Sequence, residues 1–90
     1  MKTIVKLSMN GCMPCKQYEP TFKKVAKEFP EHCWEELSLE NDNARQLASD
    51  LKIRSVPATI VYADGDINSA RVKMGIMTEQ QLKEWINDSV

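Results

Sequence analysis

Two cysteines, Cys12 and Cys15, stand three positions apart, after an apolar run and before an amphipathic one. In that context a C-x-x-C predicts a redox pair. Residues i and i+3 in the first turn of a helix are neighbours, so the two sulfurs can close a short disulfide or remain a dithiol with little backbone change. We expect Cys12 at the helix entrance with its sulfur outward, and Cys15 one turn further in and more covered.

The start of a helix favours a thiolate, because its first N–H groups are unsatisfied and the macrodipole is positive there. Pro14 suits a first-turn position, and Lys16 adds a nearby cation. A free cysteine with a pKa near ~8.5 is only ~3% thiolate at pH 7, whereas one lowered to ~7 is about half thiolate. A lower pKa weakens the nucleophile but makes Cys12 a better leaving group, which favours reversible exchange.

The hydrophobic spacing predicts the elements that position these cysteines. A buried strand at 3–7 precedes them. An amphipathic helix follows, bent by Pro20 and ended by Pro30. The next strand is expected at 32–39, with its two leucines facing inward.

The second half of the chain predicts a short helix, a hairpin and a last helix. Candidate N-caps at 41–43 precede a helix that runs to about Leu51. Strands are expected at 57–62 and 66–74, joined by a tight turn at Asp64-Gly65.

After Gly75 the chain carries a capping box, with Thr78 as the N-cap and Gln81 three residues on. The buried face of the last helix is then formed by Leu82, Trp85 and Ile86. The whole chain, residues 1–90, is predicted to be one α/β domain of order β-α-β-α-β-β-α. Its first crossover implies a parallel pair and its closing hairpin an antiparallel one, which gives a mixed four-stranded sheet with helices on both faces.

The composition excludes several function classes. A net charge of −1 gives no electrostatic basis for binding nucleic acid or an anionic membrane. No apolar run approaches ~18–20 residues, and Lys6 interrupts the N-terminal one, so neither a membrane helix nor a signal peptide is expected. Three cysteines are too few for a disulfide scaffold, which favours a reducing, cytoplasmic setting where the pair cycles.

Several motifs in a shared order resemble the thioredoxin family over nearly the whole chain. The segment 12–16 reads C-M-P-C-K where the family usually has C-G-P-C-K, and Pro20 matches its helix-kinking proline. The segment 52–59 is similar to the family's Y-x-I-R-x-I/V-P-T. Gly75 and the last-helix segment 81–86 complete the resemblance.

The resemblance implies a thioredoxin fold and a thiol–disulfide oxidoreductase that reduces protein disulfides. Cys12 would attack the target disulfide and Cys15 would resolve the mixed disulfide. It also implies a cis peptide at Val56-Pro57, beside the cysteines. The expected substrate-binding residues are Met13, Pro14, Val56, Pro57 and Gly75.

The expected partners are disulfide-containing target proteins, with a thioredoxin reductase or glutathione as electron donor. Beyond the redox-active Cys12–Cys15 disulfide itself, we expect no cofactor and no metal. We also expect a monomer.

The chain departs from the family at several positions. It opens at what would be the second strand, and Gly11 replaces the usual tryptophan, which predicts a flatter substrate groove. Lys6 stands where the family has a buried carboxylate behind the second cysteine, and Ser38 where that carboxylate's lysine partner would be. The family's proton relay therefore cannot be transferred to this chain.

Lys6 has two interpretations. As a cation near the pair it would favour the thiolate and make the couple more oxidising than a typical thioredoxin. Alternatively, its stem runs along the core and its ammonium lies in water.

Cys33 is expected to be a small apolar filler at a strand start. A zinc site from Cys12, Cys15, His32 and Cys33 would have suitable ligands, but a helix of ~15 residues, ~22 Å long, separates the two pairs. For the same reason His32 is expected to be an exposed loop residue and not a general base.

The other large side chains suggest packing. Trp34 and Trp85 are expected to pack against the core or its edge. Met74 and Ile76 would join Met13 in an adaptable apolar rim, and two of the other methionines are expected in the core.

Two alternative functions remain open. A glutathione-dependent glutaredoxin fits the short length, but Gly75 is followed by Ile76 and Met77 where glutaredoxins have paired glycines and then acidic residues. The other alternative is a binding module that uses the fold as an accessory subunit with idle cysteines.

Overall fold

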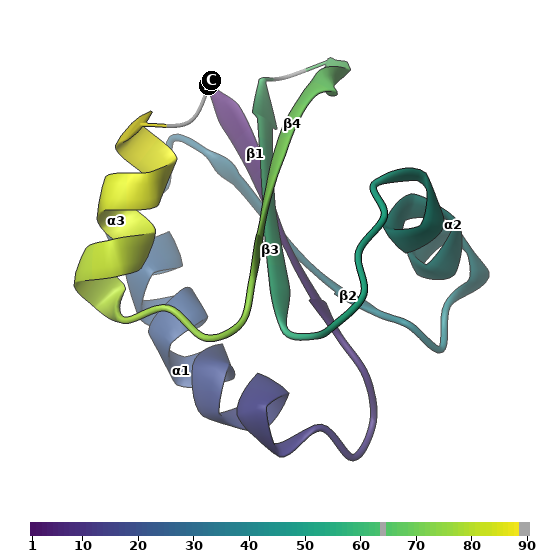
Figure 1. Ribbon diagram of the computed structural model, residues 1–90. Coiled ribbons are helices and arrows are strands. Elements are labelled where there is room, and N and C mark those ends of the chain that lie inside the picture. The colour runs from purple at the N-terminus through teal and green to yellow at the C-terminus, as the bar shows by residue number, and fades with distance from the viewer. Residues whose placement is uncertain (64, 89–90) are drawn as a thin grey trace.

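The computed structural model describes residues 1–63 and 65–88. Within them the chain forms four strands and three helices in the predicted order (Figure 1). The elements are β1 (Lys2–Ser8), α1 (Met13–Glu28), β2 (Cys33–Ser38), α2 (Asp42–Asp50), β3 (Ala58–Ala63), β4 (Asp66–Met74) and α3 (Glu79–Asp88).

The four strands form one mixed sheet in the order β2-β1-β3-β4. β1 and β2 are parallel, and the β1–β3 and β3–β4 pairs are antiparallel, so the predicted topology is confirmed. The register places Lys6 of β1 between Glu36 on β2 and Thr59 on β3. These three residues therefore form one row across the sheet.

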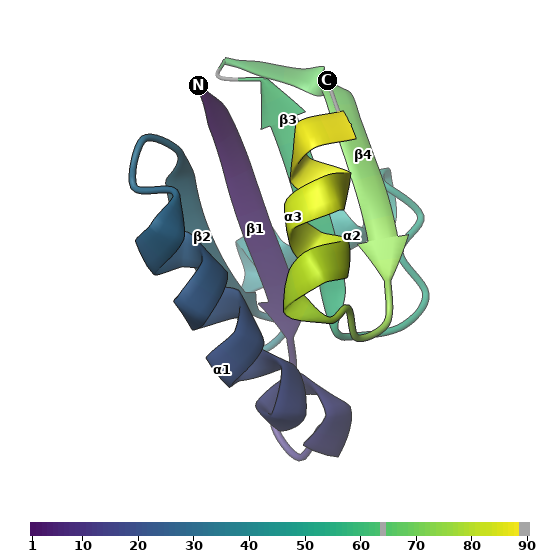
Figure 2. The ribbon, with the colours of Figure 1, turned by 90° about the vertical axis from the view of Figure 1, so that its left-hand side faces the viewer.

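Helices cover both faces of the sheet, as predicted: α1 and α3 lie together on one face and α2 on the other (Figures 1 and 2). Alternation along β1 sends Ile4 to the α1 face and Val5 and Leu7 to the α2 face. The α1 face is aromatic and large, and the α2 face is built mostly from smaller aliphatic side chains. The main members on the α1 face are Ile4, Tyr18, Phe22, Val25, Val61, Met77, Leu82 and Ile86.

The helix ends follow local sequence signals. Cys12 is the N-cap of α1, and Pro20 lies inside that helix. Asn41 caps α2 by accepting from the backbone N–H groups of Asn43 and Ala44. The capping box of α3 is confirmed, because Thr78 and Gln81 each accept a hydrogen bond from the other's backbone N–H.

The hairpin between β3 and β4 falls partly beyond the described residues, since the predicted turn residue Asp64 lies outside them. Gly65 has a φ of +77°, which suits a glycine in a turn. β3 begins at Ala58, one residue after the expected Pro57. Among the helices in the described part of the chain, none is both long and apolar enough to cross a bilayer.

Candidate active site

Three segments meet at one end of the sheet: the start of α1, the stretch before β3, and the residue after β4 (Figure 1). The Gly75 N–H donates a 2.8 Å hydrogen bond to the Pro57 carbonyl. The Val56 carbonyl oxygen lies 3.9 Å from the Cys12 sulfur. The Val56–Pro57 peptide is cis. The structure thus brings Val56, Pro57 and Gly75 together beside Cys12.

Cys12 and Cys15 form a disulfide with their Cα atoms 5.2 Å apart, inside the range that disulfides normally span. Cys15 is buried, with 3% exposure, whereas Cys12 is half-buried. The expectation of an outer and an inner cysteine is therefore met. Cys12 is the more accessible cysteine of the pair.

The first turn of α1 supplies a backbone donor to the outer sulfur. The Cys15 N–H donates to the Cys12 Sγ at 3.1 Å. Pro14 lies in the first turn, where no acidic residue stands. A thiolate formed at Cys12 on reduction would keep this N–H and lie at the positive end of the helix dipole, and both effects lower a thiol pKa.

Exposed apolar side chains, here called the apolar rim, occur in the segments that meet at the cysteine end of the sheet. Met13, between the two cysteines, is 61% exposed, and Pro14 is exposed as well. Met74 and Ile76, on either side of Gly75, also expose much of their surface. Side chains of this kind adapt to varied apolar partners, so the rim suits a site that receives protein surfaces.

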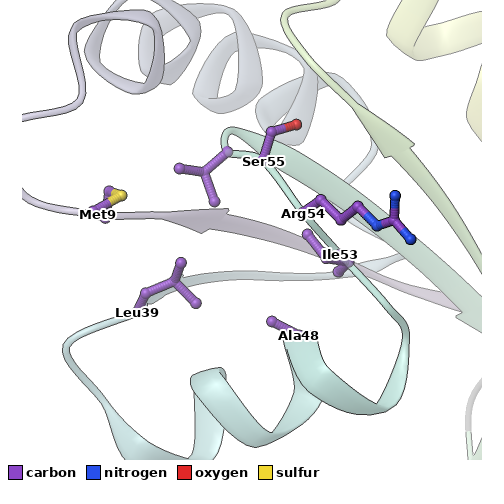
Figure 3. Close-up of a pocket in the computed structure, with 7 residues that line it drawn as sticks. Met9, Leu39, Ala48, Ile53, Arg54 and Ser55 are labelled. Carbon is purple, nitrogen blue, oxygen red and sulfur yellow. The ribbon is translucent and has the colours of Figure 1, made fainter.

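A pocket of about 230 Å³ opens beside Val56, and sequence reasoning missed it. In Figure 3 its apolar side chains face a common space, and the Arg54 guanidinium points away from it. The pocket escapes prediction because its walls come from four separate segments. It is lined by Met9, Leu39, Ala48, Ile53, Arg54, Ser55 and Val56.

The burial of the methionines differs from the prediction. Met77 is buried as expected of a core residue, but Met9 and Met1 are exposed, so only one of the two core methionines is found. Met9 follows the end of β1 and forms a pocket wall. The loop position, rather than the residue type, decides its exposure.

The surroundings of Lys6 contradict one of its two sequence interpretations and reveal a partner that neither expected. Its side chain is 3% exposed, so its ammonium does not lie in water. The Nζ pairs with Glu36 Oε1 at 2.9 Å and lies 5.8 Å from the centroid of the Phe22 ring. The partner position assigned to Ser38 was also wrong, since the register sets Glu36 opposite Lys6 and Ser38 opposite Ser8.

Ser38 has another role, at the loop before the cysteines. Its hydroxyl hydrogen-bonds to the Glu40 carboxylate, which also accepts from the Asn10 N–H at 3.1 Å. The Ser38 hydroxyl, followed by the Asn10 amide, lowers the pKa of Glu40. This carboxylate links the end of β2 to the loop that leads into Cys12.

A buried hydrogen bond fixes α1 to the sheet one turn after Cys15. The Tyr18 hydroxyl and the Thr59 Oγ1 are 2.7 Å apart. Burial raises the pKa of Tyr18 to about 12, and the hydrogen bond to Thr59 opposes part of this rise. Periodicity marked Tyr18 as a core residue but carried no signal for its partner on β3.

Cys33 and His32 lie far from Cys12 and Cys15. Cys33 stands opposite Thr3 at the start of β1, whereas Cys12 follows the end of β1, so the two lie at opposite ends of the sheet. Cys33 is exposed and free, which corrects the expectation of a packed filler. It begins an edge strand, where one side has no neighbouring strand to cover it.

His32 is also more enclosed than expected, with its side chain 15% exposed. Its Nδ1 accepts from the Lys2 N–H at 3.1 Å, and its ring stacks on Phe29. The packing role expected of Trp34 and Trp85 is confirmed, because both lie against the α1-face core. In residues 1–63 and 65–88, no group of three or more His, Cys, Asp or Glu side chains is arranged to hold a metal ion.

A disulfide-forming C-x-x-C at the start of a helix, beside a cis-proline on a mixed four-stranded sheet, defines a thioredoxin-like redox protein. Comparisons with known proteins agree. Residues 1–88 match the family model described as Thioredoxin. The chain is 32% identical over 85 residues to a thioredoxin of Mycoplasmoides gallisepticum, covering 94% of this chain and 81% of that protein.

A thioredoxin of Rickettsia typhi is 26% identical over 90 residues, which is 100% of this chain and 83% of that protein. In structure, the chain is similar to chloroplastic thioredoxin z, with a TM-score of 0.79 and 18% identity over 97% of this chain and 76% of the other. The chain belongs to the thioredoxin family. It is a thiol–disulfide oxidoreductase.

Proposed function

We propose that this protein reduces disulfides in target proteins, with Cys12 as the nucleophile and Cys15 as the resolving cysteine. The Cys12 thiolate attacks one sulfur of the target disulfide, and the other target sulfur leaves as a thiolate that takes up a proton. Cys15 then loses its proton and attacks the Cys12 sulfur. The target leaves with both sulfurs reduced, and two electrons have passed from the protein, which is left with the Cys12–Cys15 disulfide.

The observation that carries this proposal is the placement of Cys12. Cys12 is half-buried at the N-cap, and its sulfur accepts a hydrogen bond from the Cys15 N–H and lies 3.9 Å from the Val56 carbonyl oxygen. An attacking sulfur needs an accessible edge and a stabilised anion, and this position supplies both.

Target binding would use the backbone at Val56 and the apolar rim. An extended target segment adds to exposed backbone groups as a strand does, while pockets receive alternate side chains. Val56 both contacts the reactive sulfur and lines the pocket. We include Met13, Pro14, Pro57 and Gly75 in the proposed substrate-binding set, since Met13 and Pro14 are exposed at the start of α1 and Gly75 donates to the Pro57 carbonyl next to Val56.

Thiol–disulfide exchange moves electrons between sulfurs, so the proposed reaction uses no organic cofactor and no metal. Recycling needs an electron donor, and the family membership favours a thioredoxin reductase, with glutathione as the alternative. The protein would act as a monomer in a reducing, cytoplasmic compartment, where the pair can cycle.

The test is reduction of a protein substrate such as insulin, with reductase or glutathione supplied in separate arms. Cys12→Ser should abolish turnover, because the nucleophile is lost. Cys15→Ser should accumulate a mixed disulfide between Cys12 and the target, detectable by mass. Cys33→Ser is the matched control and should retain full activity. Turnover that survives Cys12→Ser would contradict the proposal.

A further inference from the structure

The α1 face of the sheet holds a charged group that the exchange steps do not use. Lys6 on β1 is 3% exposed, and its ammonium pairs with Glu36 at 2.9 Å. The carboxylate is on the edge strand β2, and 39% of the Glu36 side chain is exposed. The cation is thus enclosed in the core while its counter-charge reaches solvent.

The cation lies beneath the helix that carries the cysteines. Cys15, Tyr18 and Phe22 are successive members of the buried face of α1. The Lys6 Nζ is 5.8 Å from the Phe22 ring centroid. Seven residues of α-helix rise ~10 Å, so the ammonium lies on the order of 10 Å from the cysteine end of α1.

At that separation, inside a protein, an unpaired charge still acts on a thiolate, because low-dielectric surroundings screen it less than water does. A cation would stabilise the ionised, reduced form of the pair. Glu36, from β2, opposes this effect directly. From α1, Glu19 faces the same cation at longer range: its pKa is lowered chiefly by its hydrogen bond to Lys23, and to a smaller extent by the charges of Lys23 and Lys6.

We propose that Glu36 is a positioning residue of the redox site: it holds the Lys6 ammonium towards the sheet edge and cancels the field that this ammonium would otherwise exert on the cysteine thiolates. This inference rests on the proposed Cys12/Cys15 exchange. It also replaces the simpler idea that Lys6 alone makes the couple oxidising, since in the native pair the two charges largely compensate.

The test is the equilibrium of the full protein with a buffer of reduced and oxidised glutathione. Glu36→Gln removes the counter-charge, so the dithiol form should gain roughly 5- to 10-fold in its equilibrium with glutathione, where tenfold corresponds to about 30 mV. The pH profile of Cys12 alkylation should move to lower pH in the same variant. Glu35→Gln is the matched control, since Glu35 pairs opposite Val5, which faces the other side of the sheet.

A double-mutant cycle separates charge from structure. In a Lys6→Met background, Glu36→Gln should give a clearly smaller shift than in the native background, because only the carboxylate's own field on the thiolates is lost and no ammonium is released towards them. An equal shift with and without Lys6, or a shift no larger than that of Glu35→Gln, would overturn the inference. If Glu36→Gln does not fold, Glu36→Asp lengthens the ion pair and should give a smaller shift in the same direction, whereas no shift would count against the role of Glu36.

The two proposals fail differently. If the wild-type protein shows no two-electron transition with glutathione, the exchange function itself is wrong. If the transition is present but does not respond to position 36, the function stands and only the role of Glu36 is rejected.

Discussion

The two faces of the sheet are built differently. The face under α1 and α3 combines aromatic packing with specific polar pairs, Tyr18 with Thr59 and Lys6 with Glu36. The face under α2 is formed mostly by aliphatic side chains and ends in a pocket beside Val56. One face fixes the helix that carries the cysteines, and the other borders the place where we propose that a target lies.

This difference indicates a division of tasks within one sheet. The buried Tyr18–Thr59 hydrogen bond restricts how α1 packs on the sheet, because moving the helix would leave both hydroxyl groups without their partner. Aliphatic contacts are non-directional and tolerate small adjustments. Variants on the two faces should therefore differ in both the size and the kind of their effects.

The largest effect is expected from Phe22→Ala on the α1 face. Phe22 is fully buried and packs edge-on against Trp34, with ring centroids 5.3 Å apart. Its truncation should lower the free energy of unfolding by ~3–5 kcal/mol, through lost burial and the cavity left behind. The measurement is urea unfolding of the oxidised protein.

Leu47→Ala is the comparison on the α2 face, where Leu47 is half-buried. This substitution should lower the free energy of unfolding by about 1–2 kcal/mol, because folding removes less apolar surface from water at the half-buried Leu47 than at the fully buried Phe22. Equal losses in the two variants would remove the energetic distinction between the faces.

The next effect is expected from Tyr18→Phe, which leaves the buried Thr59 hydroxyl without its partner. The loss should be ~1–3 kcal/mol at pH 7, and Tyr18→Phe combined with Thr59→Val should recover most of it. Comparable losses in the single and double variants would show that packing, and not the hydrogen bond, is responsible.

The same tyrosine gives a signature at alkaline pH. Burial raises its pKa from 10.0 to about 12. Between these values the unfolded chain has lost the phenol proton while the folded protein keeps it, so stability falls as pH rises, by up to about 2–3 kcal/mol. Tyr18→Phe should lack this part of the slope in unfolding measured from pH 9 to 12.

The smallest effect is expected from Asn41→Ala at the start of α2. The Asn41 side chain accepts from the N–H groups of Asn43 and Ala44. Losing this cap should cost ~1 kcal/mol. Asn43→Ala, an exposed change in the first turn of the same helix, is the control and should cost clearly less in the same urea titration.

Local signals in the sequence predicted most of the fold. The position of the cysteines at the start of α1 and the capping box at Thr78 and Gln81 depend on residues within one turn of each other. The element order follows from hydrophobic spacing along each segment. The position of Pro57 beside Cys12 was predicted from the resemblance to the thioredoxin family and not from residue spacing.

Contacts between distant segments could not be predicted. The partner of Lys6 depends on the register between β1 and β2, and a shift of two residues would have set Ser38 there instead of Glu36. Cys33 and His32 were misjudged because their surroundings depend on which strand forms the sheet edge and on the path of the N-terminus. The pocket beside Val56 needed four segments to be placed at once.

The edge strand β2 has a consequence for how the molecule behaves at high concentration. Backbone groups along a sheet edge offer a template on which another chain can add as a strand, a route to aggregation. β2 carries Glu35 and Glu36 in succession, so a carboxylate projects on each side of the strand. A second copy aligned along β2 would bring like charges together, and that repulsion disfavours strand pairing between two copies at this edge.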